Sequence, residues 1–297
     1  MGGCIRTAFA LPQSETIFAG AMVGVACSTP ARSGFWRLSA GALALCAAFL
    51  VSGGQAATSS HALALAYQVL LGPLPVMTVT ADLALPAAAS PEGSYRADIV
   101  GRAGGYAGQV YDWSFTARSE GLAQGRALSP RRFSGENLSA LDRRPVQIAY
   151  AADGTPAPRF DPPRAEDADL RPRPTQAKGT LDPASAIVAL VRTIATTGSC
   201  AAALPVYDGR RRFDLISRAG GEELVEPLPR SLYGGPAQRC ELQLNQLDAG
   251  RERLPSQGTA WIAEIAGARV PVRLELTTAL GIITVDLVQA TTGPSPL

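Results

Sequence analysis

The chain has 297 residues, of which 46% are hydrophobic and 18% are charged, a composition typical of a globular protein. Its 27 basic and 25 acidic residues give a formal net charge of +2, which does not supply the strongly basic face that nucleic-acid binding demands. The only histidine, His61, stands in no Ser-His-Asp, Cys-His or H-E-x-x-H arrangement, which argues against histidine-based catalysis and zinc hydrolases.

An uncharged run of small and aliphatic residues covers 38–54. Two arginines precede it, and the small residues Gly54 and Ala56 follow at the spacing of a cleavage site. The run is shorter than the roughly 20 residues of a membrane-spanning helix. We therefore expect residues 1–56 to be a signal peptide or an uncleaved N-terminal anchor, and the protein to be exported to the periplasm.

Removing residues 1–56 leaves equal numbers of basic and acidic side chains and no polybasic cluster near the anchor. Electrostatic binding to lipid headgroups is not favoured by this pattern. We expect no nucleic-acid partner, and membrane contact only through an uncleaved 38–54 segment.

Two of the five cysteines, Cys200 and Cys240, lie beyond the leader. In an exported chain they have one possible pairing, and an oxidising compartment favours it. The alternatives are two free buried thiols, or redox or metal chemistry. Their wide spacing without a nearby histidine argues against a zinc site. We predict a structural disulfide.

Alternation of apolar and polar residues predicts antiparallel strands through the first half of the domain. These segments are 63–72, 76–85, 94–103, 110–118 and 146–154. Residues 155–180 are rich in proline and charge and poor in large apolar side chains, so we expect an exposed loop there.

Residues 183–197 carry the signals of an amphipathic helix. Asp182 is a suitable N-cap, Pro183 takes the first helical position, and Gly198 stands at the exit. Apolar residues recur at helical spacing within it, namely Ile187, Leu190, Val191 and Ile194.

Further strands follow the helix. Asp208-Gly209 predicts a hairpin within 203–218, residues 240–247 alternate, and 261–287 predicts three more strands. Pro271 falls inside the last group, and because proline lacks an N–H group we expect it at a sheet edge or a bulge.

The pattern predicts an α+β, mainly antiparallel β fold: a curved sheet or open half-barrel of about ten strands wrapped on one amphipathic helix. We expect a single β-rich domain over 63–288 and a disordered tail over 289–297.

Several motifs occur in a familiar order: "AYQVLLGPLPV", "LDPASAIVALVR", "VYDGRRRFDL", and "WIAEIAGARVPVRLEL" followed by "LGIITVDL". In this order the chain resembles a family of proteobacterial envelope proteins, domain of unknown function 3108, over most of residues 63–288. The resemblance implies an exported, mainly antiparallel β protein, distantly similar to the half-barrel carriers of lipoproteins. It implies no catalytic residue.

Aromatic residues provide the candidate binding site. Tyr111, Trp113 and Phe115 share one strand face, and Trp261 is a further candidate. Such residues either fill the core or, where the helix leaves a half-barrel uncovered, line an apolar ligand groove.

Carboxylates for a glycosidase-like reaction are present, but no two of them are placed as a pair by the sequence. These are Asp98, Asp112, Glu222, Glu223 and Glu264. We predict no catalytic residue, no cofactor and no metal site.

Three functions remain open from the sequence. The first is a non-catalytic, periplasmic binding or carrier module for a lipophilic ligand. The second is a structural or assembly factor of the cell envelope that acts through protein or glycan contacts, and the third is a carboxylate-dependent hydrolase. We favour the first.

Overall fold

The structure is a computed structural model that describes residues 60–86, 92–110, 112–139, 142–163, 176–247, 256–278 and 281–294. The chain divides into two units, residues 1–54 and 55–297, and all described residues belong to the second. The predicted leader, 1–56, lies outside the described residues. Within the described ranges, no helix has the length and apolar character needed to cross a membrane.

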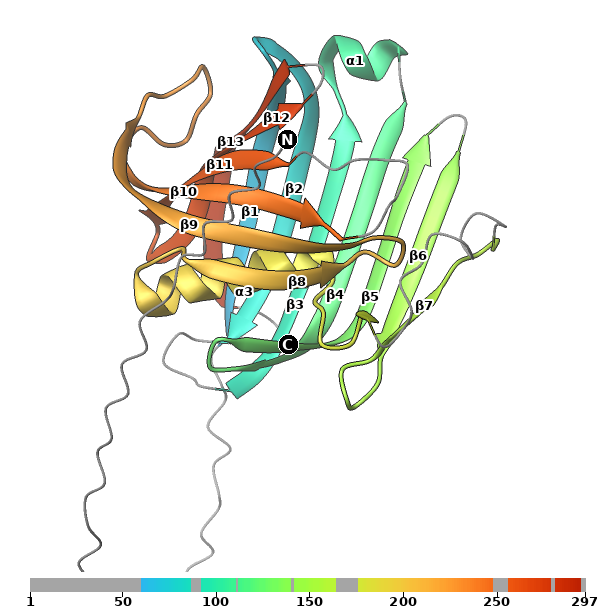
Figure 1. Ribbon diagram of the computed structural model, residues 1–297. Helices are drawn as coiled ribbons and strands as arrows, with labels where there is room; N and C mark the ends of the chain where they lie inside the picture. Colours follow the sequence, from blue (N-terminus) through green and yellow to red (C-terminus); the bar gives the residue numbers. More distant parts are fainter. Residues whose placement is uncertain are drawn as a thin grey trace, which may run out of the picture. The chain divides into compact units, whose positions relative to one another are not determined.

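Thirteen strands form one antiparallel sheet in the order β7-β6-β5-β4-β3-β2-β1-β13-β12-β11-β10-β9-β8 (Figure 1). Strands that are consecutive in the chain are neighbours in the sheet, except β7 and β8, which lie at its two edges. The first and last strands, β1 and β13, pair with each other and join the two halves of the sheet. The strands are β1 Ser60–Leu71, β2 Leu74–Pro86, β3 Glu92–Ala103, β4 Trp113–Gln124, β5 Ala127–Ser139, β6 Arg143–Tyr150, β7 Pro156–Arg159, β8 Ala202–Tyr207, β9 Arg212–Val225, β10 Gly235–Gln246, β11 Gln257–Ile265, β12 Ala268–Thr278 and β13 Gly281–Pro294. The mainly antiparallel fold is confirmed, with more strands than the ten or so predicted.

The two strands that the sequence analysis missed, β5 and β7, explain the higher count. In β5 only Phe133 is buried, so the strand has no run of large alternating apolar residues. β7 begins at Pro156 inside the segment predicted as a loop, and it pairs with β6 at the sheet edge, where proline is tolerated.

The loop predicted for 155–180 is also shorter at its other end. Ala177 and Leu181 are buried, and Leu181 forms a parallel bridge with Val206 of β8. Residues 164–175 of the predicted loop lie outside the described residues.

Most of the predicted disordered tail, 289–297, is strand. β13 continues to Pro294, which lies opposite His61 of β1. The prediction was wrong for residues 289–294 because backbone pairing with β1 holds them in the sheet although few of their side chains are apolar.

The helix α3, Pro183–Thr197, begins and ends where the sequence predicts. The Asp182 side chain accepts a hydrogen bond from the Ser185 backbone N–H at 2.9 Å. Gly198 has φ +71°, a left-handed conformation that glycine adopts without strain, and its N–H donates to the Ile194 carbonyl at 2.9 Å. The second described helix, α1, spans only Gly105–Val110.

α3 is buried on three sides rather than along one stripe. Ala184, Val188 and Val191 join the largest core cluster, while Leu190 and Ile194 pack beside the two cysteines. Ala186 and Ala189 pack in a third cluster with residues of β8 and β9. Ile187, expected on the buried face, is 43% exposed because the alanine face of the helix, not Ile187, meets β8 and β9.

The sheet bends around α3. The helix contacts β3, β4 and β5 from one half of the sheet and β8 and β12 from the other, so both halves face it (Figure 1). Thirteen twisted strands are more than an open sheet usually holds without curling.

Pro271 lies at a bulge, as predicted. The register between β11 and β12 shifts from Trp261 opposite Arg273 to Ile262 opposite Pro271. Pairing of β12 with β13 begins only at Arg273, so the missing N–H of Pro271 removes no bond to β13. Its carbonyl instead accepts a hydrogen bond from the Tyr67 hydroxyl at 3.0 Å.

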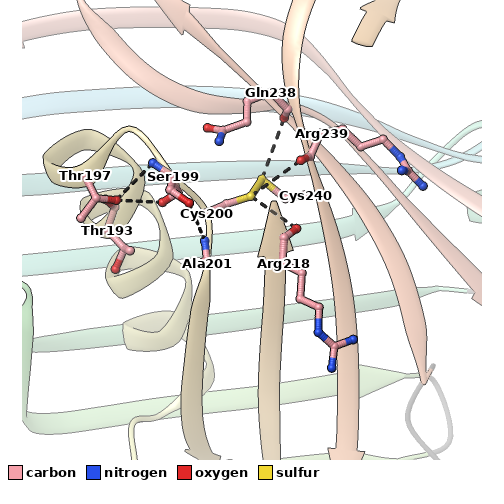
Figure 2. Close-up of a disulfide and its surroundings, with 9 residues drawn as sticks. All are labelled: Thr193, Thr197, Ser199, Cys200, Ala201, Arg218, Gln238, Arg239 and Cys240. Atoms are coloured by element: carbon pink, nitrogen blue, oxygen red, sulfur yellow. Dashed lines mark hydrogen bonds between the residues drawn. A yellow bond between two sulfur atoms is a disulfide. The ribbon is translucent and has the colours of Figure 1, made fainter. Parts of the chain in front are cut away.

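The disulfide between Cys200 and Cys240 is present. Cys200 lies three residues past the end of α3, and Cys240 lies in β10, with their Cα atoms 6.0 Å apart (Figure 2). Both residues are fully buried. The bridge ties the end of the helix to the second half of the sheet.

Candidate functional site

Five half-buried residues of β2, β3 and β4 form what we call the apolar strip. Met77 lies opposite Ala103, and Val79 lies opposite Gly101, which in turn lies opposite Phe115. The members of the strip are Met77, Val79, Ala103, Trp113 and Phe115, all of them half-buried.

Two aromatic rings dominate the strip. The ring centroids of Trp113 and Phe115 are 5.6 Å apart with planes tilted by 47°. The Phe115 ring occupies the space where a side chain on Gly101 would lie, since an ideal Cβ there would be 2.1 Å from a ring carbon. Glycine at 101 therefore lets Phe115 lie across β3 toward Val79.

The apolar strip lies at one end of a face of the sheet, and α3 covers the other end of the same face. Farther along β2, Ala81, Leu83 and Leu85 are buried. On β4 the corresponding position, Ser119, is fully buried and donates to the Asp182 carboxylate at 2.9 Å. The helix thus covers one end of this sheet face and leaves the strip at the other end half-exposed.

A buried polar cluster fixes the beginning of α3 against β3 and β4. Asp182 Oδ2 accepts from the Ser185 hydroxyl at 2.6 Å and from the Ser119 hydroxyl at 2.9 Å. The Tyr95 and Ser185 hydroxyls are 2.6 Å apart. Such a fully partnered network specifies one position for the helix.

Burial shapes the acid–base properties of the cluster. It raises the pKa of the Asp182 carboxyl group, although hydrogen bonds from Ser185 and Ser119 oppose the rise. Burial also raises the pKa of Tyr95 to about 12. The Tyr150 hydroxyl, whose pKa burial also raises, has no hydrogen-bond partner within the described ranges.

At the far end of the helix, Arg192 gives a second polar contact. Its guanidinium donates to the Gly125 carbonyl, in the turn between β4 and β5, at 2.7 Å. Burial lowers the pKa of this side chain. The helix is thereby aligned along the Ser119–Gly125 end of β4, away from Trp113 and Phe115.

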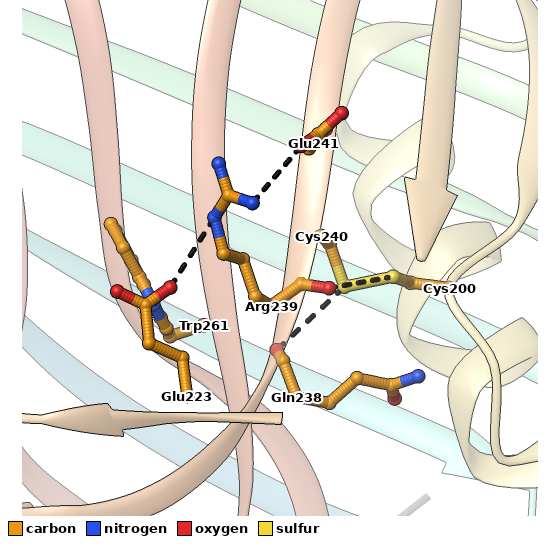
Figure 3. A network of polar contacts seen from close by, with 7 residues as sticks. All are labelled: Cys200, Glu223, Gln238, Arg239, Cys240, Glu241 and Trp261. Atoms are coloured by element: carbon orange, nitrogen blue, oxygen red, sulfur yellow. Dashed lines mark hydrogen bonds and ion pairs between the residues drawn. A yellow bond between two sulfur atoms is a disulfide. The ribbon is translucent and has the colours of Figure 1, made fainter. Parts of the chain in front are cut away.

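Of the four predicted groove residues, Trp113 and Phe115 come together and Trp261 does not join them. Ala260 and Ile262 of β11 pack with Leu190 and Ile194 of the helix, so strand alternation points Trp261 to the opposite face. The indole N–H of Trp261 donates to Glu223 Oε2 at 3.2 Å (Figure 3). Tyr111 lies outside the described residues.

Two of the acidic residues considered for hydrolysis, Asp98 and Glu223, form ion pairs with arginines on different strands. Asp98 of β3 pairs with Arg96 at 2.8 Å and with Arg118 at 2.7 Å. Glu223 of β9 pairs with Arg239 at 3.3 Å. Within the described part of the chain, no group of three or more His, Cys, Asp or Glu residues is placed to hold a metal ion.

Sequence reasoning missed the cluster around Asp182. Asp182 was recognised as an N-cap, but Ser119 and Tyr95 carry no local signal that relates them to it. Ser119 meets the Asp182 carboxylate, and Tyr95 meets Ser185, only because the fold brings together residues 63 and 90 positions apart in the chain.

Together, the bent antiparallel sheet, the covering helix and the half-exposed apolar strip define a β-rich protein with an internally anchored helix. The sequence matches the family model DUF3108, "Protein of unknown function", over residues 66–288, and the chain belongs to this family.

Two further comparisons complete these findings. A solved structure similar to this chain is the β-barrel-like protein of domain of unknown function DUF1849 from Brucella abortus. The identity is 10%, the match covers 80% of this chain and 99% of that chain, and the TM-score is 0.45. No curated protein matches the chain.

Proposed function

We propose that the protein is an exported, non-catalytic periplasmic module that binds a lipophilic ligand, and that the apolar strip contacts the ligand's acyl chain. The sheet acts as an open half-barrel, with α3 in its hollow. The observation that carries the proposal is the half-exposed strip of apolar residues on a sheet face that α3 otherwise covers.

The burial of the strip supports an apolar ligand. Each of its residues lies on the same face as fully buried core residues, yet remains half-exposed. Covering apolar surface is favourable by about 25 cal/mol per Å² removed from water. An acyl chain lying across the strip would bury this surface against Trp113 and Phe115.

The space beneath α3 is not the proposed site. Val188 and Ile194 have no exposed surface and Ala184 is 1% exposed, so the helix packs directly against the sheet. A ligand on the strip leaves the helix in place.

Fatty-acid binding by the full-length chain tests the proposal. Lipid extracted from purified protein, and titration with the fluorescent fatty acid cis-parinaric acid, should reveal a saturable lipophile site. Ala103→Phe, which fills the strip opposite Trp113, should weaken binding by at least about tenfold, because added bulk displaces the ligand.

The matched control adds the same ring to the neighbouring position on the other face. Arg102 is exposed, so Arg102→Phe should leave the affinity unchanged. Absence of saturable binding by the wild-type chain, or equal loss in both variants, would contradict the proposal.

A further inference from the structure

A polar cavity lies on the second half of the sheet, apart from the apolar strip. Its volume is about 310 Å³ and residues of β9 to β13 line it. Volumes of roughly 300–1,000 Å³ are typical of small-molecule sites, so the cavity suits a small ligand.

A row of polar side chains crosses four adjacent strands of the lining, which also includes Leu242 and Ile282. Arg218 of β9 lies opposite Glu241 of β10, which lies opposite Thr259 of β11. Thr259 lies opposite Glu275 of β12. The four side chains therefore form one row across four strands.

This row points away from α3. Cys240, Ala260 and Leu274, which alternate with Glu241, Thr259 and Glu275, belong to the cluster that packs against Leu190 and Ile194. The row and the apolar strip are thus on different faces and in different halves of the sheet.

Ion pairs pre-arrange one side of the cavity. Arg239, which also lines it, pairs with Glu241 at 3.0 Å and with Glu223 at 3.3 Å (Figure 3). The half-buried ring of Trp261 donates to the same Glu223 carboxylate, which fixes the indole beside the row. Hydrogen-bonded side chains in fixed positions lose less conformational freedom when a ligand binds.

Two charged groups in the cavity remain available. Among the ion pairs of the described residues, none includes Arg218 or Glu275. Arg218 presents hydrogen-bond donors and Glu275 presents acceptors. The two residues lie at opposite ends of the row, with Glu241 and Thr259 between them.

We propose that this cavity binds a neutral sugar unit of a glycan. Two arginines, two glutamates, two glutamines and two threonines line it, so it offers donors and acceptors without net charge. Sugar hydroxyls both donate and accept, and they match such a lining. A phosphate would find no net positive charge to offset its own, because the two glutamates balance the two arginines. An apolar ligand would leave these polar groups desolvated without partners.

Binding of neutral oligosaccharides to the full-length chain tests this site. Chitotriose, maltotriose and cellotriose are titrated by isothermal calorimetry, with inorganic phosphate as a further probe. At least one sugar should bind saturably. Thr259→Trp, which fills the cavity, and Glu275→Gln, which removes the free carboxylate, should each weaken that binding by at least about tenfold.

Matched variants separate the site from general effects. Thr80→Trp places the same ring on the exposed face of β2, and Glu264→Gln removes an exposed carboxylate elsewhere on β11. Both should bind sugar as the wild type does, and far-ultraviolet circular dichroism should show every variant folded. Ala103→Phe should also leave sugar binding unchanged, which separates this site from the fatty-acid site.

Three outcomes would overturn the inference. They are no saturable binding of any sugar, binding that Thr259→Trp leaves intact, and binding of phosphate with Glu275→Gln strengthening it. Binding of the trisaccharides but not of the free monosaccharides would assign the site to a polymeric glycan, and equal binding of both would assign it to a single sugar unit.

Discussion

Asp182 combines two roles at the start of α3. It caps the helix through Ser185, and it is the central acceptor of a cluster that reaches Ser119 on β4. The carboxylate is fully buried, and burial raises its pKa above the usual value of 3.8. The folded protein therefore holds this proton more tightly than the unfolded chain does.

This difference gives a pH dependence with a definite sign. Since the folded pKa is the higher one, the stability contributed by Asp182 is fully present below the unfolded pKa and is lost as pH rises through the folded pKa. Asp182→Asn keeps an N-cap oxygen but removes the charge. The stability of Asp182→Asn relative to wild type should therefore increase from pH 4 to pH 8.

Urea unfolding of both proteins across this pH range measures the effect, because other ionisable groups shift both curves alike. Asp182→Ala is the comparison that removes the cap and the shared acceptor of the Ser119 and Ser185 hydroxyls, and it should lose about 2–4 kcal/mol. A wild-type to Asp182→Asn difference that does not change with pH would show that the carboxyl titrates equally in both states.

At the scale of elements, the disulfide holds the end of α3 to β10. The two cysteines are separated by 40 residues. Closing a loop of this length stabilises a fold by about 4 kcal/mol in the chain-entropy model, and real cases are often lower.

Replacing both cysteines should therefore lower the free energy of unfolding. Cys200→Ala/Cys240→Ala is expected to lose up to about 4 kcal/mol, measured by urea denaturation without reductant. Dithiothreitol should lower the stability of the wild type and leave the double variant unchanged. Identical wild-type curves with and without reductant would be inconsistent with a bridge that stabilises the fold.

Local signals explain which elements could be predicted. The caps of α3 lie within a few residues of the helix, so its ends were predicted correctly. Its buried surface was not, because the alanines at 186 and 189 pack against β8 and β9 while the larger Ile187 remains exposed. Side-chain size alone did not identify the contact face.

Local sequence signals also identified some strands and missed others. β2 was recognisable because one face is buried and the other exposed, whereas β5 has a single buried side chain, Phe133. The apolar strip was anticipated in part, through Trp113 and Phe115 on one strand. The separation of Trp261 from them was not, since it depends on which face of β11 meets the helix.

At the scale of the whole molecule, β13 joins two sheet halves that are built from separate parts of the chain. It pairs with β1 on one side and with β12 on the other. The pairing of His61 with Pro294 is also the most distant in sequence that the register contains. Contacts of such large separation are slow to form during folding.

Removal of β13 should consequently prevent cooperative folding. A chain that ends after Thr278 is expected to show no cooperative urea transition, because β1 and β12 would each lose a neighbour. A chain that ends after Pro294 retains the whole strand and serves as the control, with an unchanged midpoint. A cooperative transition near the wild-type midpoint in the shorter chain would exclude a central role for β13.

The adjacency of His61 and Pro294 has a consequence for how this fold can be encoded. The start of β1 lies beside the end of β13, so a short peptide would connect them. New ends would then be opened in the connection between β10 and β11. Circular permutation would thus rearrange the linear order of the segments while keeping every strand beside its present neighbours in the sheet.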